Sequence, residues 1–234
     1  MVKVSDNLSI VKPSWIVPSN VHAIQTIRDS VPKKNQQYTS KILVENEIGL
    51  KFLRKNLKGL NQVHSNISVK LPSDEQDADA SYSFNKGIVC SVRTADCMPL
   101  LMTDDEGSFV SAIHAGWRGL SSGIIENTVK KINAKGNFIV WIGPHISQKY
   151  FEVSAEVKNI FLKNDPSTEP AFDEVVNDKY LLSMQNVAKI KLHKFGIKNI
   201  NCMVNFCTYD NPKLFYSFRR GDLKERMTSL IWIE

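Results

Sequence analysis

The feature that most constrains the fold is a buried-strand pattern that runs directly into a glycine-rich turn and a helix pattern. The apolar residues 109–113 lead into His114-Ala115-Gly116-Trp117-Arg118-Gly119, and residues 120–129 have the spacing of a helix. Glycine lets the backbone approach a ligand closely, and free N–H groups at a helix start suit an anion. His114 alone could equally well be a core histidine that orders the turn. Whether it has a functional role therefore depends on which other residues lie near it.

Other apolar runs predict the remaining elements. Residues 45–57 and 177–195 predict helices, and the second of these has one apolar face and a stop at Gly196. Strands are predicted at 88–93, 99–102, 137–142, 150–153, 202–206, 214–218 and 228–233.

Composition bounds the class of protein. The chain has 234 residues, 42% hydrophobic and 23% charged, which is ordinary for a globular protein with a sizeable core. The apolar runs are strand-sized and no apolar signal region follows Met1, so we expect a cytoplasmic protein with no membrane association. Four cysteines are too few for a disulfide scaffold, and in a reducing compartment they should be thiols.

The net charge of +6 leaves the partner open between nucleic acid and a small anion. Lysines are spread along the chain, and no basic run is interleaved with aromatic residues. A small anionic substrate is therefore favoured over RNA or DNA.

Two further residues could join His114. His64 lies where a short strand is expected to meet a loop, and alone it would be an ordinary surface histidine. Cys97 lies between two predicted strands, beside the carboxylate of Asp96. A buried cysteine is usually inert packing, but a deprotonated one at such a junction can be functional. The acidic residues 73–80 are more typical of a solvated loop than of a metal site.

Arg219 and Arg220 follow the predicted strand at 214–218. Adjacent arginines after a strand are usually solvated. The alternative is a bidentate grip on a phosphate or carboxylate.

Taken together, these residues carry a resemblance to a known family. In motif order the chain resembles the YfiH-like family, long labelled multicopper polyphenol oxidoreductase or laccase-domain protein and now associated with purine nucleoside phosphorylase activity. The similarity covers about residues 60–234. It rests on Gln62-Val63-His64, Thr94-Ala95-Asp96-Cys97-Met98-Pro99, His114-Ala115-Gly116-Trp117-Arg118-Gly119, Trp141-Ile142-Gly143-Pro144, Tyr150-Phe151-Glu152-Val153, Cys207-Thr208 and Phe215-Tyr216-Ser217-Phe218-Arg219-Arg220.

The resemblance implies a single α+β domain over residues 1–234, with mixed β-sheets flanked by helices and fewest signals in residues 1–58. It implies a zinc site made by His64, Cys97 and His114. It also implies phosphorolysis of adenosine, inosine, guanosine or methylthioadenosine, with adenosine deaminase activity as well, so the expected partners are purine nucleosides and inorganic phosphate. Two segments depart from the family pattern and bear on substrate preference: residues 26–30 replace a Thr-Arg-Gly-Gly type turn, and residues 224–226 replace a Thr-Gly-Arg element.

The chemistry of the three ligands agrees with zinc. One thiolate and two neutral imidazoles are a good borderline-soft ligand set for zinc, and three protein ligands leave the fourth tetrahedral position open, as catalytic sites require. Copper is the less favoured metal. Phosphorolysis needs cations and backbone donors that hold the phosphate in line. We expect Arg118, the 116–119 turn and Arg219 or Arg220 to bind it. Asp96 is the candidate catalytic carboxylate, either orienting a ligand or handling a proton.

Three other functions use the same sequence differently. A multicopper oxidase needs many more histidines than the five present. A metal-free Cys97/His114 nucleophile pair would make the protein an amidase or another hydrolase whose activity survives chelation. A non-enzymatic binding or regulatory protein would need none of the three ligands.

Overall fold

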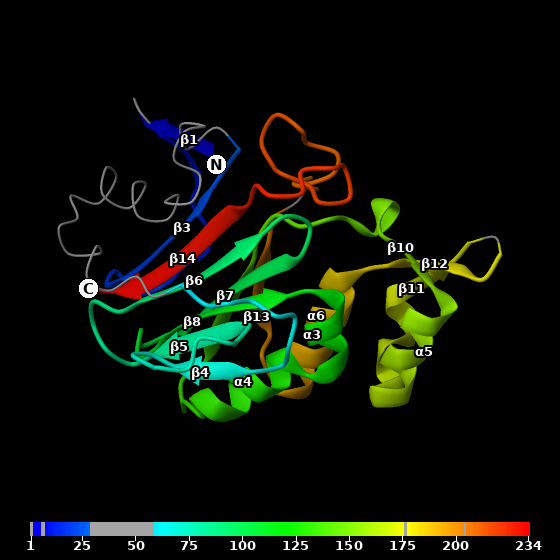
Figure 1. Ribbon diagram of the computed structural model, residues 1–234. Helices are drawn as coiled ribbons and strands as arrows, with labels where there is room; N and C mark the ends of the chain where they lie inside the picture. Colours follow the sequence, from blue (N-terminus) through cyan, green and yellow to red (C-terminus); the bar gives the residue numbers. More distant parts are fainter. Residues whose placement is uncertain (1, 6–7, 29–58, 176, 204) are drawn as a thin grey trace.

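The computed structural model describes residues 2–5, 8–28, 59–175, 177–203 and 205–234. In this part of the chain two large sheets lie face to face, and helices cover the outer face of the second (Figure 1). Apolar side chains from both sheets fill the space between them, among them Val92 and Ile231 from one and Ala112 and Trp141 from the other. The second sheet is therefore the middle layer of a three-layer structure.

The first sheet is antiparallel and has, within the described residues, five strands in the order β1-β2-β3-β14-β6. Its C-terminal strand lies between β3 and β6, which explains why residues 227–233 are all buried. The strands are β1 (Val2–Ser5), β2 (Leu8–Val11), β3 (Val21–Thr26), β6 (Val89–Thr94) and β14 (Met227–Ile233).

The second sheet is mixed, and its described strands follow the order β13-β9-β7-β8-β5-β4. The two outer pairs, β13 with β9 and β4 with β5, are parallel, while the inner pairs are antiparallel. All side chains of β7 and β8 are buried because both faces of the sheet are covered. The strands are β4 (Ser68–Lys70), β5 (Ala80–Ser83), β7 (Met98–Asp104), β8 (Val110–Ala115), β9 (Phe138–Ile142) and β13 (Asn199–Cys202).

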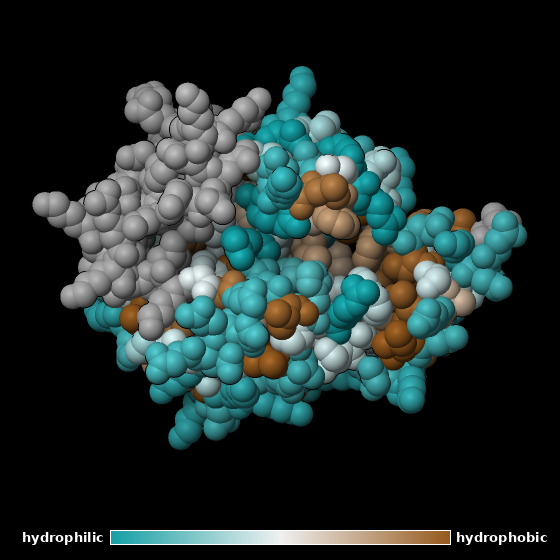
Figure 2. Space-filling view, viewed as in Figure 1, coloured by the Kyte–Doolittle hydropathy of each residue, from teal (hydrophilic) through white to brown (hydrophobic). Residues whose placement is uncertain are grey.

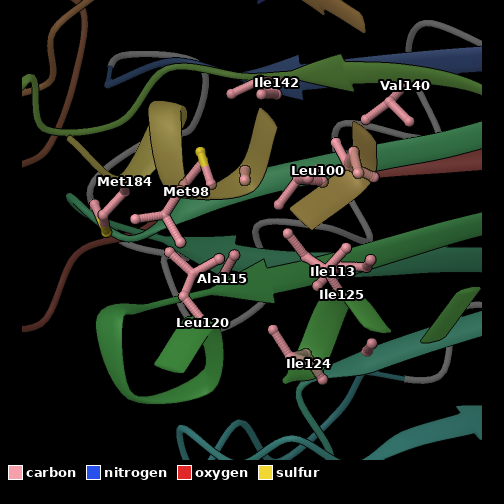
Figure 3. Packing of buried hydrophobic residues seen from close by; sticks show 14 of the residues in the cluster. Met98, Leu100, Ile113, Ala115, Leu120, Ile124, Ile125, Val140, Ile142 and Met184 are labelled. Atoms are coloured by element: carbon pink, nitrogen blue, oxygen red, sulfur yellow. The ribbon is translucent and has the colours of Figure 1, made fainter. Parts of the chain in front are cut away.

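Three helices pack on the outer face of the second sheet: α3 (Trp117–Ser122), α4 (Ile124–Ile132) and α6 (Met184–Lys194). Figure 3 shows the interface, where side chains of α3 and α4 such as Leu120 and Ile124 meet Ile113 and Ala115 of β8. Gly123 ends α3 in the left-handed conformation, with φ 96°, and turns the chain into α4. The expected helix over 120–129 is thus two helices.

A smaller sheet lies at one side of the molecule, with the described strands in the order β10-β12-β11 (Figure 1). Helix α5 (Ala155–Asn164) follows its first strand directly. The other elements here are β10 (Glu152–Ser154), β11 (Phe172–Glu174), β12 (Lys179–Leu182) and the short 3-10 helices η2 (Gln148–Tyr150) and η3 (Pro166–Ala171).

The α+β class with mixed sheets and flanking helices is confirmed. The strands predicted at 88–93, 99–102, 109–113, 137–142 and 228–233 are present as β6, β7, β8, β9 and β14. The helix predicted at 45–57 lies outside the described residues. In the described ranges no helix is both long and apolar enough to cross a membrane.

Two sequence predictions are wrong in part. The helix expected over 177–195 begins at Met184, because residues 179–182 form β12 between two partner strands and Ser183 caps the helix. The strand expected at 150–153 is displaced to 152–154, after the 3-10 turn of η2.

The strands expected at 202–206 and 214–218 do not form. Only Cys202 belongs to a strand, β13, and residues 214–218 are irregular. Side chains stabilise this segment instead of a strand partner: the Arg220 guanidinium donates to the carbonyl oxygens of Thr208, Tyr209 and Phe215. Bonds of this kind leave no pattern in the local sequence.

Lys191 of α6 gives a stability test. Its side chain is 2% exposed, its ammonium group contacts the Glu126 carboxylate, and Asp165 lies 3.9 Å away. Lys191→Ala should lower the free energy of unfolding by about 3 kcal/mol, because it leaves the partly buried Glu126 carboxylate without its partner. Urea unfolding of this variant and of the exposed-site control Lys198→Ala measures the effect. The double variant Lys191→Met/Glu126→Leu should recover most of the loss, and a Lys191→Ala loss no larger than the control's would contradict this view.

Candidate functional site

The structure brings together the three residues predicted as metal ligands. His64, Cys97 and His114 each offer one ligand atom, and these atoms all lie within 4.8 Å of one another. Cys97 Sγ is 3.9 Å from His64 Nε2, and the two imidazole rings meet edge to face with centroids 4.8 Å apart. Residues far apart in the sequence thus converge on one point.

Strand pairing places two of these ligands side by side. Pro99 of β7 pairs with His114 of β8, and Met98 pairs with Ala115, so Cys97 lies next to the end of β8. Asp96, with φ 83°, forms the tight connection from β6 in the first sheet to β7 in the second. The site therefore lies where the chain crosses between the two sheets.

Asp79 orients the two histidines of this group. Its buried carboxylate accepts hydrogen bonds from His114 Nδ1 at 2.7 Å, from the backbone N–H of His64 at 3.0 Å, and from both the N–H and the hydroxyl of Ser65. Because Nδ1 of His114 is held by Asp79, its Nε2 is the nitrogen left for a metal. His64 itself lies in a loop with φ 60°, and the short strand expected before it is absent.

Asp79 corrects the sequence interpretation of residues 73–80 as a solvated loop. Asp74, Glu75 and Asp77 are exposed as expected, but Asp79 is fully buried. Burial raises the pKa of Asp79, yet the hydrogen bonds from His114 and Ser65 outweigh it and lower the pKa below the usual value. In the sequence, the small apolar residues Ala78 and Ala80 on either side of Asp79 are the feature that could have indicated a buried carboxylate.

The glycines of the central turn are needed for close packing at the ligands. A Cβ atom added to Gly116 would lie 3.1 Å from both Cys97 Sγ and His64 Cδ2. One added to Gly119 would lie 2.9 Å from the carbonyl oxygen of Ser65. The turn thus presses the loop that carries His64 and Ser65 against the end of β8, which explains both glycines.

The protonation states suit a metal. Burial raises the pKa of Cys97, but the hydrogen bonds and charges of His114 and His64 outweigh it and bring the pKa to about 6. Burial lowers the pKa of His114, and Asp79 with Cys97 raises it to about 9. The lowered pKa of Cys97 favours the thiolate, which is the form of cysteine that binds a metal, and a metal at His114 would displace the proton from its Nε2. One thiolate and two imidazoles, one of them fixed by a carboxylate, fit zinc.

The three ligands open into a cavity of about 660 Å³. Figure 2 shows the hollow, with hydrophobic residues in its depth and hydrophilic residues around it. Aromatic side chains of Trp117, Phe151 and Phe218 contribute to its wall. Among the described residues its cationic lining consists of Arg93, Arg118, Arg219, Lys224 and Arg226.

Asp96 lines this cavity, but its carboxylate is engaged by the protein. Oδ1 accepts a hydrogen bond from the Thr208 hydroxyl at 2.6 Å, and Oδ2 accepts from the Ser217 hydroxyl and from the backbone N–H of Arg219. These bonds tie two C-terminal loops to the Cys97 turn. The geometry favours a positioning role for Asp96 over proton transfer to a substrate.

The predicted phosphate-binding arginines are placed differently from one another. Arg118 and Arg219 line the cavity. The Arg220 guanidinium instead binds three carbonyl oxygens and the carboxylate of Asp222, so it stabilises the loop. Sequence reasoning missed Arg93, and it singled out residues 224–226 only as a departure from the family pattern that bears on substrate preference, without assigning Lys224 or Arg226 to the cavity.

Known proteins and a known family match this chain along nearly its whole length. Residues 33–234 match the family described as multi-copper polyphenol oxidoreductase laccase. A Haemophilus influenzae protein named purine nucleoside phosphorylase is 36% identical, and the alignment covers 97% of this chain and 100% of that protein. The Escherichia coli K12 protein named purine nucleoside phosphorylase YfiH is 40% identical over 74% of this chain and 72% of its own.

Solved structures have the same fold. The crystal structure of a Neisseria meningitidis protein has a TM-score of 0.85 and 29% identity, covering 96% of this chain and 99% of the other. YlmD from Geobacillus stearothermophilus has a TM-score of 0.77 and covers 92% of this chain and 93% of its own, but at 22% identity it speaks to the fold alone.

Asp222 makes the loop beside the cavity sensitive to acid. Its carboxylate accepts hydrogen bonds from Arg28, Arg220 and the N–H of Ser217. Burial raises its pKa, but Arg28, Ser217 and Arg220 outweigh this and lower it to about 2. A lowered pKa means that this stabilisation, about 2 kcal/mol, is present above pH ~4 and is lost as the pH falls toward ~2.

Asp222→Asn tests this in urea unfolding at a series of pH values. The wild type should be more stable than the variant at pH 6, and the difference should shrink between pH ~4 and ~2. Asp173→Asn, at an exposed position of β11, is the control. A wild-type advantage that stays constant down to pH ~2 would show that Asp222 does not carry the effect.

Proposed function

This chain belongs to the multicopper polyphenol oxidoreductase laccase family, and we propose that it is a zinc-dependent purine nucleoside phosphorylase, the activity for which its relatives in Haemophilus influenzae and Escherichia coli are named. The observation that carries the proposal is the opening of the His64, Cys97 and His114 group into a cavity lined by cations and aromatic rings. Such a cavity offers phosphate and a purine complementary surfaces.

His64, Cys97 and His114 would hold the zinc ion, with Asp79 fixing the orientation of His114. When bound, zinc polarises a substrate oxygen or lowers the pKa of a bound water. Copper is the less favoured occupant, because a site with one thiolate and two imidazoles, in a chain of five histidines, cannot build a multicopper cluster.

Phosphate binding is assigned to Arg118, Arg219 and the backbone of the 116–119 turn. In phosphorolysis an oxygen of inorganic phosphate attacks the anomeric carbon while the bond to the purine breaks, so the phosphate must be held in line with the leaving base. The Arg219 guanidinium lies over the Phe151 ring at 5.4 Å and donates to the carbonyl oxygen of Glu152. Asp96 contributes by binding the N–H of the same arginine.

The aromatic rings of the cavity would bind the purine. Phe218 is 56% exposed, which is unusual for a phenylalanine, and its ring faces the cavity with Phe151 and Trp117. A base that stacks on such a ring removes apolar surface from water on both partners. The proposed nucleosides are adenosine, inosine, guanosine and methylthioadenosine, with deamination of adenosine as an additional reaction.

A second function is favoured by one observation. The lowered pKa of Cys97 and the raised pKa of His114 describe a thiolate–imidazolium pair, which is the resting state of a cysteine nucleophile. A metal-free hydrolase of this kind would remain active after chelation, whereas the zinc phosphorylase would not.

Release of free base tests the proposed activity. Purified protein should contain close to one zinc ion per chain and release adenine or hypoxanthine from adenosine or inosine only when phosphate is present. Cys97→Ala should lose the metal and at least 100-fold in kcat/KM, because two histidines alone bind zinc weakly. Cys202→Ala, a cysteine on β13 away from the cavity, is the matched control.

The outcomes separate the two functions. Phosphate-dependent release that is lost on chelation and restored by zinc supports the phosphorylase. Activity that survives chelation, or a metal-free protein without base release, contradicts it.

Asp96→Asn tests the positioning role. The amide replaces one acceptor oxygen with a donor that faces the Thr208 and Ser217 hydroxyls or the Arg219 N–H, so Arg219 should shift. We expect the KM for phosphate to rise about tenfold, with zinc content unchanged and a smaller change in kcat. Asp173→Asn is the control. A large fall in kcat with an unchanged KM for phosphate would instead indicate direct proton transfer by Asp96.

A further inference from the structure

The cavity holds more positive charge than its proposed reactants require. Of the described residues that line it, five are cations and one, Asp96, is a carboxylate. Asp96 already accepts hydrogen bonds from Thr208, Ser217 and Arg219. The cations are Arg93, Arg118, Arg219, Lys224 and Arg226.

The carboxylates of the described residues do not neutralise these cations. In the part of the chain that the structure describes, none of the five forms an ion pair with a carboxylate. Among the described residues, the guanidinium groups of Arg219 and Arg226 donate only to backbone carbonyl oxygens. Arg220, next to Arg219 in the chain but absent from the cavity wall, is paired with Asp222. The unpaired cations are thus a feature of the cavity wall.

Like charges gathered around one cavity repel one another, and an anionic ligand offsets that repulsion. A nucleoside is neutral, and inorganic phosphate carries about two negative charges near pH 7. Free phosphate and a nucleoside therefore leave much of the positive charge unmatched. A phosphate on the nucleoside itself would bring the total to about four negative charges.

The cations are also arranged beside aromatic rings. The Arg118 guanidinium lies 4.4 Å from the centroid of the Trp117 ring, that of Arg219 lies 5.4 Å from Phe151, and that of Arg226 lies 5.9 Å from Phe218. All of these residues line the cavity. A nucleotide presents the same pairing of a flat base with an anion, and rings next to arginines are how proteins bind nucleotide units.

We propose that the preferred substrate is a purine nucleoside 5′-phosphate, which binds together with inorganic phosphate. This inference rests on the proposed phosphorylase function. The cavity, at about 660 Å³, is within the usual size range for ligands of this class. An oxygen of hydrogen phosphate bonds to the anomeric carbon and the bond from that carbon to the purine nitrogen breaks. The base leaves with the electron pair and receives the proton of the hydrogen phosphate, and the products are free base and ribose 1,5-bisphosphate.

The test compares adenosine with adenosine 5′-phosphate on the zinc-loaded protein. Release of adenine is measured with phosphate present, and binding of each compound is measured by calorimetry without phosphate. We expect at least tenfold higher kcat/KM and at least tenfold tighter binding for the 5′-phosphate. Lys224→Ala should reduce the ratio of the two kcat/KM values several-fold, and Lys213→Ala, at an exposed position outside the cavity wall, should leave the ratio unchanged.

The outcomes are distinguishable from those of the proposed function. Adenine release from adenosine with equal or weaker release and binding of the 5′-phosphate would overturn this inference and leave the phosphorylase intact. Tight binding of the 5′-phosphate without base release from either compound would overturn both the phosphorylase and the proposed substrate, and would show the 5′-phosphate to be a ligand only. Weak binding of both compounds without base release would overturn both.

Discussion

The hydrogen bond between the Asp79 carboxylate and His114 Nδ1 is the interaction on which the site depends. A carboxylate with no exposed surface is strongly destabilising unless donors surround it, and Asp79 accepts from His114, His64 and Ser65 at once. Satisfying this one group therefore fixes the orientation of one ligand and the backbone of another. The left-handed conformation of His64 is held by the same contacts.

The Asp96 turn plays the corresponding part on the other side of the cavity. It carries the chain from the first sheet to the second, places Cys97 beside the end of β8, and holds the C-terminal loop through the N–H of Arg219. The C-terminal strand β14, bound between β3 and β6, anchors the far end of that loop. The ligands and the cationic wall are thus linked through a single buried carboxylate, so a change at Asp96 should be felt in anion binding more than in the ligand group.

How far the sequence predicts this structure depends on the range of the interactions. The central strands were predictable because a continuous apolar run indicates a buried strand from neighbouring residues alone. The glycine turn was predictable because glycines mark places where two backbone segments lie close together. The three residues proposed as metal ligands were identified through their motifs, and two of them, Cys97 and His114, lie at the ends of β7 and β8 or next to them. Asp79 was missed because a buried acid is rare, and its partners lie elsewhere in the sequence.

The irregular C-terminal segment was misread for the same reason. The Arg220 guanidinium holds this segment by binding carbonyl oxygens up to twelve residues away. In the same way, β12 was mistaken for helix because its pairing with β10 and β11 overrides the helix-like spacing of its apolar residues. The cations Arg93, Lys224 and Arg226 come together because β14 pairs with β6, with Met227 opposite Thr94. Long-range side-chain contacts, more than secondary structure, set the limit of the sequence analysis.

X-ray absorption at the zinc edge, on protein purified without added metal, tests the central claim most directly. An open metal centre made by His64, Cys97 and His114 predicts one sulfur ligand at about 2.3 Å and two imidazole nitrogens at about 2.0 Å, with a lighter atom completing the shell. The sulfur contribution should disappear in Cys97→Ala. A protein that holds no metal, or a zinc shell of oxygen and nitrogen alone in the unaltered chain, would contradict it.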